Sequence, residues 1–138
     1  MKKAMWFTCL FLYSLLTLAQ SQTPSPPGAE EYFITPKDGA TVTSPVTIKF
    51  GLKNMGIAPA GVSTENTGHH HLLIDTELPA LDKPIPADDK HVHFGKGQTE
   101  TSLKLAPGKH TLQLLLGDHT HTPHNPPVMS KPITITVK

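Results

Sequence analysis

Arginine is absent from this chain, and cysteine occurs only once, as Cys9. Because Cys9 lies in an N-terminal segment that we expect to be removed, the mature protein has no thiol for a disulfide, a zinc–thiolate site, an iron–sulfur cluster or a cysteine nucleophile. The 12 basic residues are all lysines, and 11 acidic residues balance them. The chain therefore has no large excess of positive charge, which nucleic-acid binding needs, and we expect no nucleic-acid partner.

Long apolar runs are scarce as well, and the one that exists lies at the N-terminus. Two lysines precede a mainly apolar stretch from Ala4 to Leu18, and small residues follow it. This order is typical of a secretory signal peptide, here cleaved after Ala19 or Ser21. We therefore predict a signal peptide over residues 1–21, a periplasmic or secreted mature protein, and no stable membrane span after cleavage. An uncleaved anchor is the alternative.

Sustained helical periodicity is missing from the rest of the chain, which has short extended segments between proline and glycine turns. Apolar and polar residues alternate along 46–53 and 110–116, as on strands with one face in a core. We predict strands over residues 32–35, 46–53, 69–75, 91–94, 99–105, 110–116 and 133–137. After a flexible Pro/Ser/Gln-rich leader over residues 22–31, residues 32–138 are predicted to form one all-β domain, an immunoglobulin-like antiparallel β-sandwich of about seven strands.

Histidine is the residue in excess, with nine in the chain. Residues i and i+2 of a strand point to the same face, so His69 and His71 form one same-side pair and His91 and His93 another. If the strands alternate in direction as in immunoglobulin-like domains, these pairs and the loop DHTHTPH after residue 117 share one end of the sandwich. The candidate metal ligands are therefore His69, His71, His91, His93, His119, His121, His124, Met55 and Met129.

The types of ligand indicate the metal. Neutral imidazole binds copper, zinc, nickel or iron, and a methionine thioether favours copper, particularly in its cuprous form. Copper is therefore the first choice of cofactor and zinc the second. Methionine more often packs in cores, so Met129 anchoring the last strand and Met55 lying in a loop are the alternatives for these two residues. For the run of three histidines at 69–71, the alternative is a solvated strand end.

Two further histidines are predicted to be structural. His70 shares a face with Leu72 and Ile74, which favours core packing, or a hydrogen bond that supports the site, over metal ligation. His110 follows the Pro107-Gly108 turn, where sandwich domains often place a corner tyrosine whose polar tip bonds back to the turn backbone. We expect His110 to make a similar bond and to lie outside the metal site.

Several blocks of this sequence match a known family in order. The chain contains the segments PKDGATVTSPVTIKFGLKNMGIAPAG, TGHHHLLID, HVHFGKGQTE, LKLAPGKHTLQLLLGDHTHTPHNPP and ITITV. From about Phe33 to Lys138 it resembles the domain-of-unknown-function 4399 family, which consists of small exported bacterial proteins. The resemblance marks His69, His71, His93, Asp118 and His119 as family features, and does not mark His121 or His124. It implies no activity, because the function of the family is unassigned.

Two classes of function fit these features. The first is an exported metal-binding protein that captures, delivers or buffers copper, with the metal ion and a metal-receiving envelope protein as its partners. The second is an immunoglobulin-like envelope or adhesion module that binds a protein or a glycan, with histidines that are structural or respond to pH. The scarcity of aromatic residues disfavours the second class. A metal-dependent enzyme is a variant of the first, but only Glu100 and Asp75 offer a separate general base, and they indicate no substrate.

Overall fold

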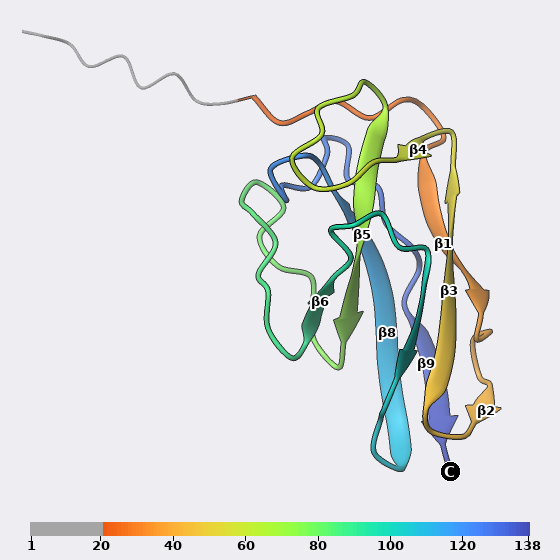
Figure 1. Ribbon diagram of the computed structural model, residues 1–138. Helices are drawn as coiled ribbons and strands as arrows, with labels where there is room; N and C mark the ends of the chain where they lie inside the picture. Colours follow the sequence, from red (N-terminus) through yellow and green to blue (C-terminus); the bar gives the residue numbers. More distant parts are fainter. Residues whose placement is uncertain (1–20) are drawn as a thin grey trace, which may run out of the picture.

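The computed structural model describes residues 21–138, and the regular structure in this range consists of β-strands. The strands form two sheets, which confirms the predicted all-β sandwich. Figure 1 shows β1 and β3 on the right and β5, β6 and β8 to their left. None of the described residues forms a helix that is long and apolar enough to cross a membrane. The predicted signal peptide over residues 1–21 lies outside the described range, except for Ser21.

The smaller sheet has three antiparallel strands in the order β1-β3-β7. These strands are β1 (Glu30–Thr35), β3 (Val46–Lys53) and β7 (Glu100–Leu103). Along β3 the structure buries Val46, Ile48 and Phe50 and exposes Thr47 and Lys49. The alternation seen in the sequence therefore directs one face of this sheet into the core, because successive strand residues point to opposite sides.

The larger sheet has six strands in the order β2-β9-β8-β5-β4, with β6 paired to β5. Its members are β2 (Thr41–Val42), β4 (Gly56–Ile57), β5 (Thr67–Ile74), β6 (His91–His93), β8 (Gly108–Gly117) and β9 (Ile133–Val137). Strands β5 and β8 form the longest antiparallel ladder, from His69 opposite Gly117 to Ile74 opposite Leu112. This ladder fixes the backbone positions of His69, His70 and His71.

Each of the seven predicted strands has a counterpart, and β2 and β4 are additional two-residue strands. One pairing differs from the immunoglobulin-like order, in which the fourth predicted strand would join the sheet of β1, β3 and β7. In the structure this strand, β6, instead pairs with β5 and places His93 directly opposite His71. His93 therefore meets the pair of His69 and His71 through strand pairing on one face of a sheet, and not only because loops share one end of the sandwich.

Strand β5 is buried on both faces. Leu72 and Ile74 pack in the core between the sheets. On the outer face, Leu73 packs with Ile85 and Leu115, because the loops that follow β5 and β8 fold over this side of the larger sheet. Side chains on the outer face of β5 are consequently shielded from solvent, which is unusual for a polar residue such as histidine unless it has a partner.

The leader over residues 22–31, predicted to be flexible, is bound to the domain. Strand β1 already begins at Glu30, and the backbone N–H of Asn125 donates to the carbonyl of Thr23 at 3.0 Å. Polar side chains in this segment, such as Gln22, also find carbonyl partners on distant loops. These hydrogen bonds offset the entropy lost by ordering the segment, a gain that composition alone does not reveal.

Candidate metal centre

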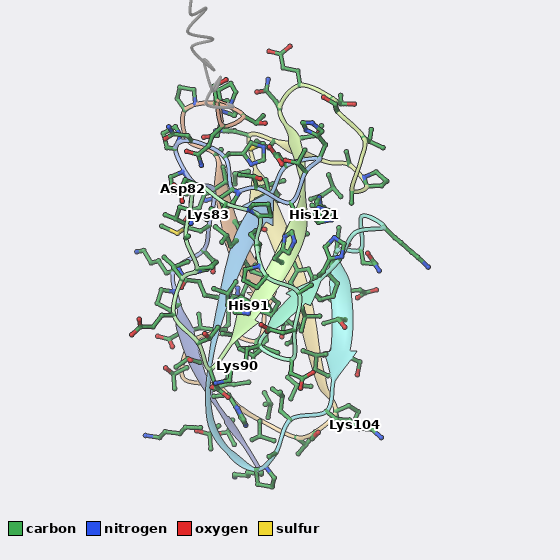
Figure 2. All side chains as sticks on the ribbon, turned by 90° about the vertical axis from the view of Figure 1, so that its left-hand side faces the viewer. Asp82, Lys83, Lys90, His91, Lys104 and His121 are labelled. Atoms are coloured by element: carbon green, nitrogen blue, oxygen red, sulfur yellow. The ribbon has the colours of Figure 1, made fainter. Side chains whose placement is uncertain are left out.

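Four imidazole rings come together on the outer face of the larger sheet. Two come from β5, where alternation places residues 69 and 71 on the same side. One comes from β6, opposite β5 in the antiparallel register, and one from the loop after β8. Figure 2 shows this face with His121 labelled. We call this group the histidine cluster, which consists of His69, His71, His93 and His121.

All pairs of rings in the histidine cluster are close to one another. The shortest separation of ring centroids is 4.7 Å, between His93 and His121, and the longest is 6.1 Å, between His71 and His121. The other pairs are separated by 4.8 to 5.1 Å. If four imidazoles bound one ion tetrahedrally through nitrogen at about 2.0–2.1 Å, their centroids would be about 5 Å apart. The ring centroids therefore have nearly the spacing that ligands of one ion would have, and the nitrogens that lie close enough to share an ion are those of His69, His71 and His93.

The ring nitrogens at the centre of the cluster lack partners. One nitrogen each from His69, His71 and His93 lies within 4.8 Å of the others. Neither nitrogen of His69 nor Nδ1 of His71 has a hydrogen-bond partner among the described residues, although both side chains are at most 1% exposed. Buried polar atoms in native proteins are nearly always hydrogen-bonded, so such exceptions require an explanation. A cation could bind the nitrogen of each ring that carries a lone pair and would be the missing partner there, whereas the N–H of His69 would still need an acceptor.

Burial keeps these rings neutral. It lowers the pKa of His69 to about 4, and the neighbouring rings of His93 and His121 lower this pKa further. Burial, followed by the same neighbours and His69, lowers the pKa of His71 to about 3. The pKa of His93 is also lowered, by burial and by His121. Because a metal binds the unprotonated ring, these histidines are ready to act as ligands at neutral and mildly acidic pH.

A tight turn after β8 carries His121 to the cluster. The backbone N–H of His121 donates to the carbonyl of Asp118 at 2.9 Å, and its carbonyl accepts from the N–H of Ile85 at 2.8 Å. His121 has a φ of 66°, in the left-handed region that residues other than glycine rarely adopt. Such a conformation costs free energy and persists only where the surroundings impose it, often at functional sites.

Two glycines make room for the rings. A Cβ atom at Gly117 would lie 2.6 Å from Cε1 of His71, and a Cβ atom at Gly95 would overlap the ring of His93. Any side chain at these positions would therefore push a ring of the cluster aside. Glycine at these two positions therefore leaves the space that the rings of His71 and His93 occupy.

Replacing Gly117 with alanine should weaken metal binding about tenfold or more, because the ring of His71 must move away from the added methyl group. Gly56→Ala is the matched control, since a Cβ atom there meets only Cγ2 of Thr67 at an ordinary 3.5 Å. Dissociation constants for Cu(II) from chelator competition would measure both effects. Equal affinities for the two variants would show that Gly117 does not shape the site.

The other predicted histidine ligands lie outside the cluster. Nδ1 of His91 donates to Oδ1 of Asp88 at 2.8 Å, and Figure 2 shows His91 well separated from His121. Nε2 of the buried His124 donates to the carbonyl of Thr67 at 3.2 Å. His119 is half-buried beside the pocket that Asp118 also lines. In the loop after β8, the structure thus brings His121 to the other three rings and leaves His119 and His124 aside.

Neither predicted methionine ligand joins the cluster. Met129 packs against Leu73, Ile85 and Leu115 on the outer face of the larger sheet. Met55 is half-buried in the turn between β3 and β4. The ligand atoms that lie together in the cluster are ring nitrogens of His69, His71 and His93.

His70 points the other way, into the core, as predicted for a structural histidine. Its Nδ1 hydrogen-bonds Oε1 of Glu31, and its ring packs against Phe50 with centroids 5.1 Å apart. Burial raises the pKa of Glu31 well above its ordinary value and lowers the pKa of His70 to about 4. Burial therefore disfavours the charged form of both groups and favours a neutral pair. Sequence reasoning did not identify Glu31.

His110 lies at the other end of β8 and makes the backbone bond predicted for it. Its Nε2 donates to the carbonyl of Ala106 at 2.8 Å, and its Nδ1 donates to Oδ2 of Asp75 at 2.7 Å. These two bonds raise the pKa of His110. Asp75, considered as a general base from the sequence, is instead a structural partner of His110 and of the backbone N–H of Thr111.

Comparison with known protein families identifies the family of the chain. A family model described as "Domain of unknown function (DUF4399)" matches residues 48–138. This range includes β5, β6, β8 and the loop that follows β8, and therefore the entire histidine cluster. No curated protein and no solved structure matches the chain.

Proposed function

The chain belongs to the DUF4399 family, and we propose that it binds one transition-metal ion in the histidine cluster. The observation that carries this proposal is the ring of His69, both of whose nitrogens are buried and have no partner in the described part of the chain. Leaving such atoms unsatisfied costs free energy, and a metal bond to one of the two nitrogens would recover part of it. Three further rings surround His69 at 4.8 to 5.1 Å, as ligands of one ion would.

Copper(II) is the metal that we propose first, and zinc second. Imidazole suits both ions, and affinity for a given set of nitrogen ligands rises to its maximum at Cu(II) in the divalent series. The expected soft ligands are missing from the cluster, because Met129 packs on Leu73 and Leu115. The support for copper therefore comes from nitrogen ligation, and the sulfur argument for copper(I) no longer applies.

Binding and transfer fit the arrangement better than catalysis does. Catalytic zinc sites keep one coordination position open for water or substrate, whereas closed four-ligand sites hold the ion. In this cluster the ring of His121 lies beside the three strand-borne rings, with centroids 4.7 to 6.1 Å away, and we propose that it supplies the fourth ligand. We therefore propose that the protein captures and buffers its ion, or delivers it.

Delivery is supported by the difference in exposure among the rings. His69 and His71 are at most 1% exposed, whereas His93 is exposed and His121 is half-buried on a loop. Ligands of an incoming protein would displace His93 and His121 first, while β5 still holds the ion. We propose a metal-receiving envelope protein as the partner and the periplasm as the compartment, on the basis of the pattern of residues 1–21.

A titration tests the proposal. The protein is purified without a histidine tag and titrated with Cu(II) and with Zn(II) against competing chelators. We expect one ion per chain, a sub-micromolar dissociation constant, and tighter binding of Cu(II) than of Zn(II). Weak binding without a defined stoichiometry would contradict the proposed function.

A further inference from the structure

The segment that precedes β1 crosses the loop that carries His121. The side-chain amide of Gln22 donates to the carbonyl of Pro123 at 3.0 Å, and the N–H of Asn125 donates to the carbonyl of Thr23 at 3.0 Å. We call residues 22–25 the N-terminal strap. Gln22 and Pro123 are separated by 101 positions in the sequence. The contact between the strap and the loop is therefore a feature of the folded domain and not of local chain geometry.

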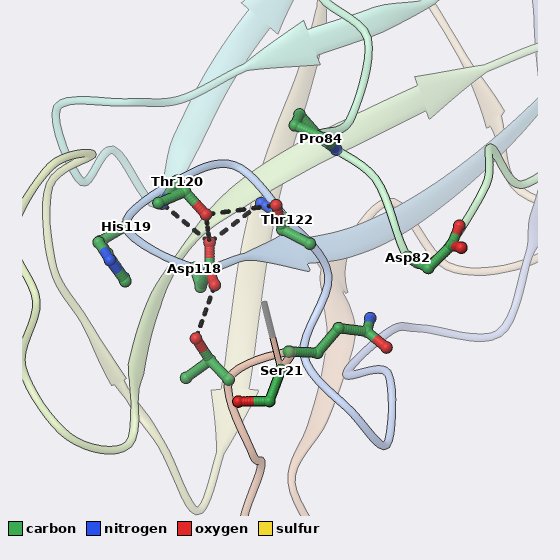
Figure 3. Close-up of a pocket in the computed structure, with 9 residues that line it drawn as sticks. Ser21, Asp82, Pro84, Asp118, His119, Thr120 and Thr122 are labelled. Carbon is green, nitrogen blue, oxygen red and sulfur yellow. Dashed lines mark hydrogen bonds between the residues drawn. The ribbon is translucent and has the colours of Figure 1, made fainter. Parts of the chain in front are cut away.

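One carboxylate joins the strap to the turn around His121. The hydroxyl of Thr23 donates to Oδ2 of Asp118 at 2.6 Å. Oδ1 of Asp118 accepts from the N–H and the hydroxyl of Thr120, at 2.8 and 2.7 Å, and from the N–H of Thr122 at 3.0 Å. Figure 3 shows the bonds of Asp118 to Thr120 and Thr122 in the pocket beside the loop. Asp118 thus binds the residues on both sides of His121, and the strap binds Asp118.

We propose that Thr23 and Asp118 are positioning residues that hold His121 over the other three rings, so that the N-terminal strap sets how fast the metal leaves the site. This inference rests on the proposed function. His69, His71 and His93 are fixed by the pairing of β5 with β6 and β8. His121 has no such ladder, and its left-handed φ makes its position depend on what holds the turn.

The hydroxyl of Thr23 matters because Asp118 is buried. The residue is 4% exposed, and hydrogen bonds to a carboxylate are stronger than those between neutral groups. Without the hydroxyl, Oδ2 would be left with no partner in the described structure, which costs more than the bond itself contributes. The turn would then favour conformations in which water reaches Asp118. Because Asp118 binds the residues on both sides of His121, His121 would move away from the ion in these conformations.

Threonine variants of the whole protein test this inference. Thr23→Val removes the hydroxyl and keeps the shape of the side chain, Thr23→Ser keeps the hydroxyl, and Thr47→Val alters an exposed threonine of β3 in the other sheet. Each protein is loaded with Cu(II) and mixed with excess chelator to measure the rate of metal release. Electron paramagnetic resonance of the loaded protein reports how many nitrogens bind the ion.

We expect Thr23→Val to release Cu(II) about tenfold faster, in line with the cost of removing residues that support metal ligands. Its spectrum should show fewer bound nitrogens than that of the unaltered protein, whereas Thr23→Ser and Thr47→Val should match the unaltered protein. An unchanged rate and spectrum for Thr23→Val would overturn this inference alone, even if the melting temperature fell. Failure of the unaltered protein to bind Cu(II) tightly would overturn the proposed function as well.

Discussion

A His69→Ala/His71→Ala variant should bind Cu(II) at least about a thousandfold more weakly than the unaltered protein, since removing even a residue that only supports a ligand costs about 10–100-fold in affinity. Both rings come from the outer face of β5 and are at most 1% exposed. Because both rings are held by a strand, no histidine on a loop can move into their positions. Chelator competition with Cu(II) would measure the loss.

Strand β6 supplies a matched control. His93→Ala should weaken binding by more than about 100-fold, because the ring lies in the cluster. His91→Ala changes the same residue type two positions earlier and should leave affinity nearly unchanged, because His91 contacts Asp88 instead. His110→Ala should likewise spare affinity, while costing roughly 1–2 kcal/mol of unfolding free energy through its lost hydrogen bonds. Equal losses of Cu(II) affinity for His91→Ala and His93→Ala would contradict the proposal that the metal binds in the histidine cluster.

The metal-free protein should lose stability in mild acid, and His69 should account for about 3 kcal/mol of the loss between pH 7 and pH 4. An unfolded histidine takes up its proton near pH 6.5, whereas burial lowers the pKa of His69 in the folded protein to about 4. Between these values the unfolded state binds the proton and the folded state does not. The free energy of unfolding therefore falls as the pH falls, and it recovers as the pH rises.

A His69→Leu variant removes this contribution, together with the effect of His69 on the pKa of His71. Denaturant unfolding of both metal-free proteins at pH 7 and pH 4 should show the variant gaining about 3 kcal/mol relative to the unaltered protein at the lower pH. The contribution of His110 to the free energy of unfolding depends on pH in the opposite direction, because its pKa is raised in the folded protein. His110 stabilises the fold below pH 6.5, and this stabilisation is lost as the pH rises through the folded pKa. If the difference in unfolding free energy between the two proteins were the same at pH 7 and pH 4, His69 would not be buried and neutral.

Much of the fold follows from local patterns that sequence alone displays. The alternation over residues 46–53 and 110–116 predicted β3 and β8, because a strand with one buried face must alternate. The same rule placed His69 and His71 on one side of a strand and turned His70 to the other, where it meets Glu31. These predictions needed only the geometry of a single strand.

What the sequence did not reveal depends on contacts between distant segments. The convergence of His93 with His71 requires β6 to pair with β5, a choice of partner that no strand pattern specifies. Within DHTHTPH, the backbone turn at Asp118 selects His121 over its two neighbouring histidines. The contact between Thr23 and Asp118 spans 95 positions of the chain. The proposed ligand set therefore follows from tertiary structure, whereas the expectation of a histidine-rich site follows from composition and spacing.

A crystal structure of the protein with bound Cu(II), with the ion located by its anomalous scattering, tests the central claim most directly. We expect one strong peak within about 2.0–2.1 Å of a ring nitrogen from each member of the histidine cluster. An ion held instead by His91 and Asp88, or by His119 beside the N-terminal strap, would contradict the claim. So would crystals in which the cluster stays without an ion after the protein has been saturated with Cu(II).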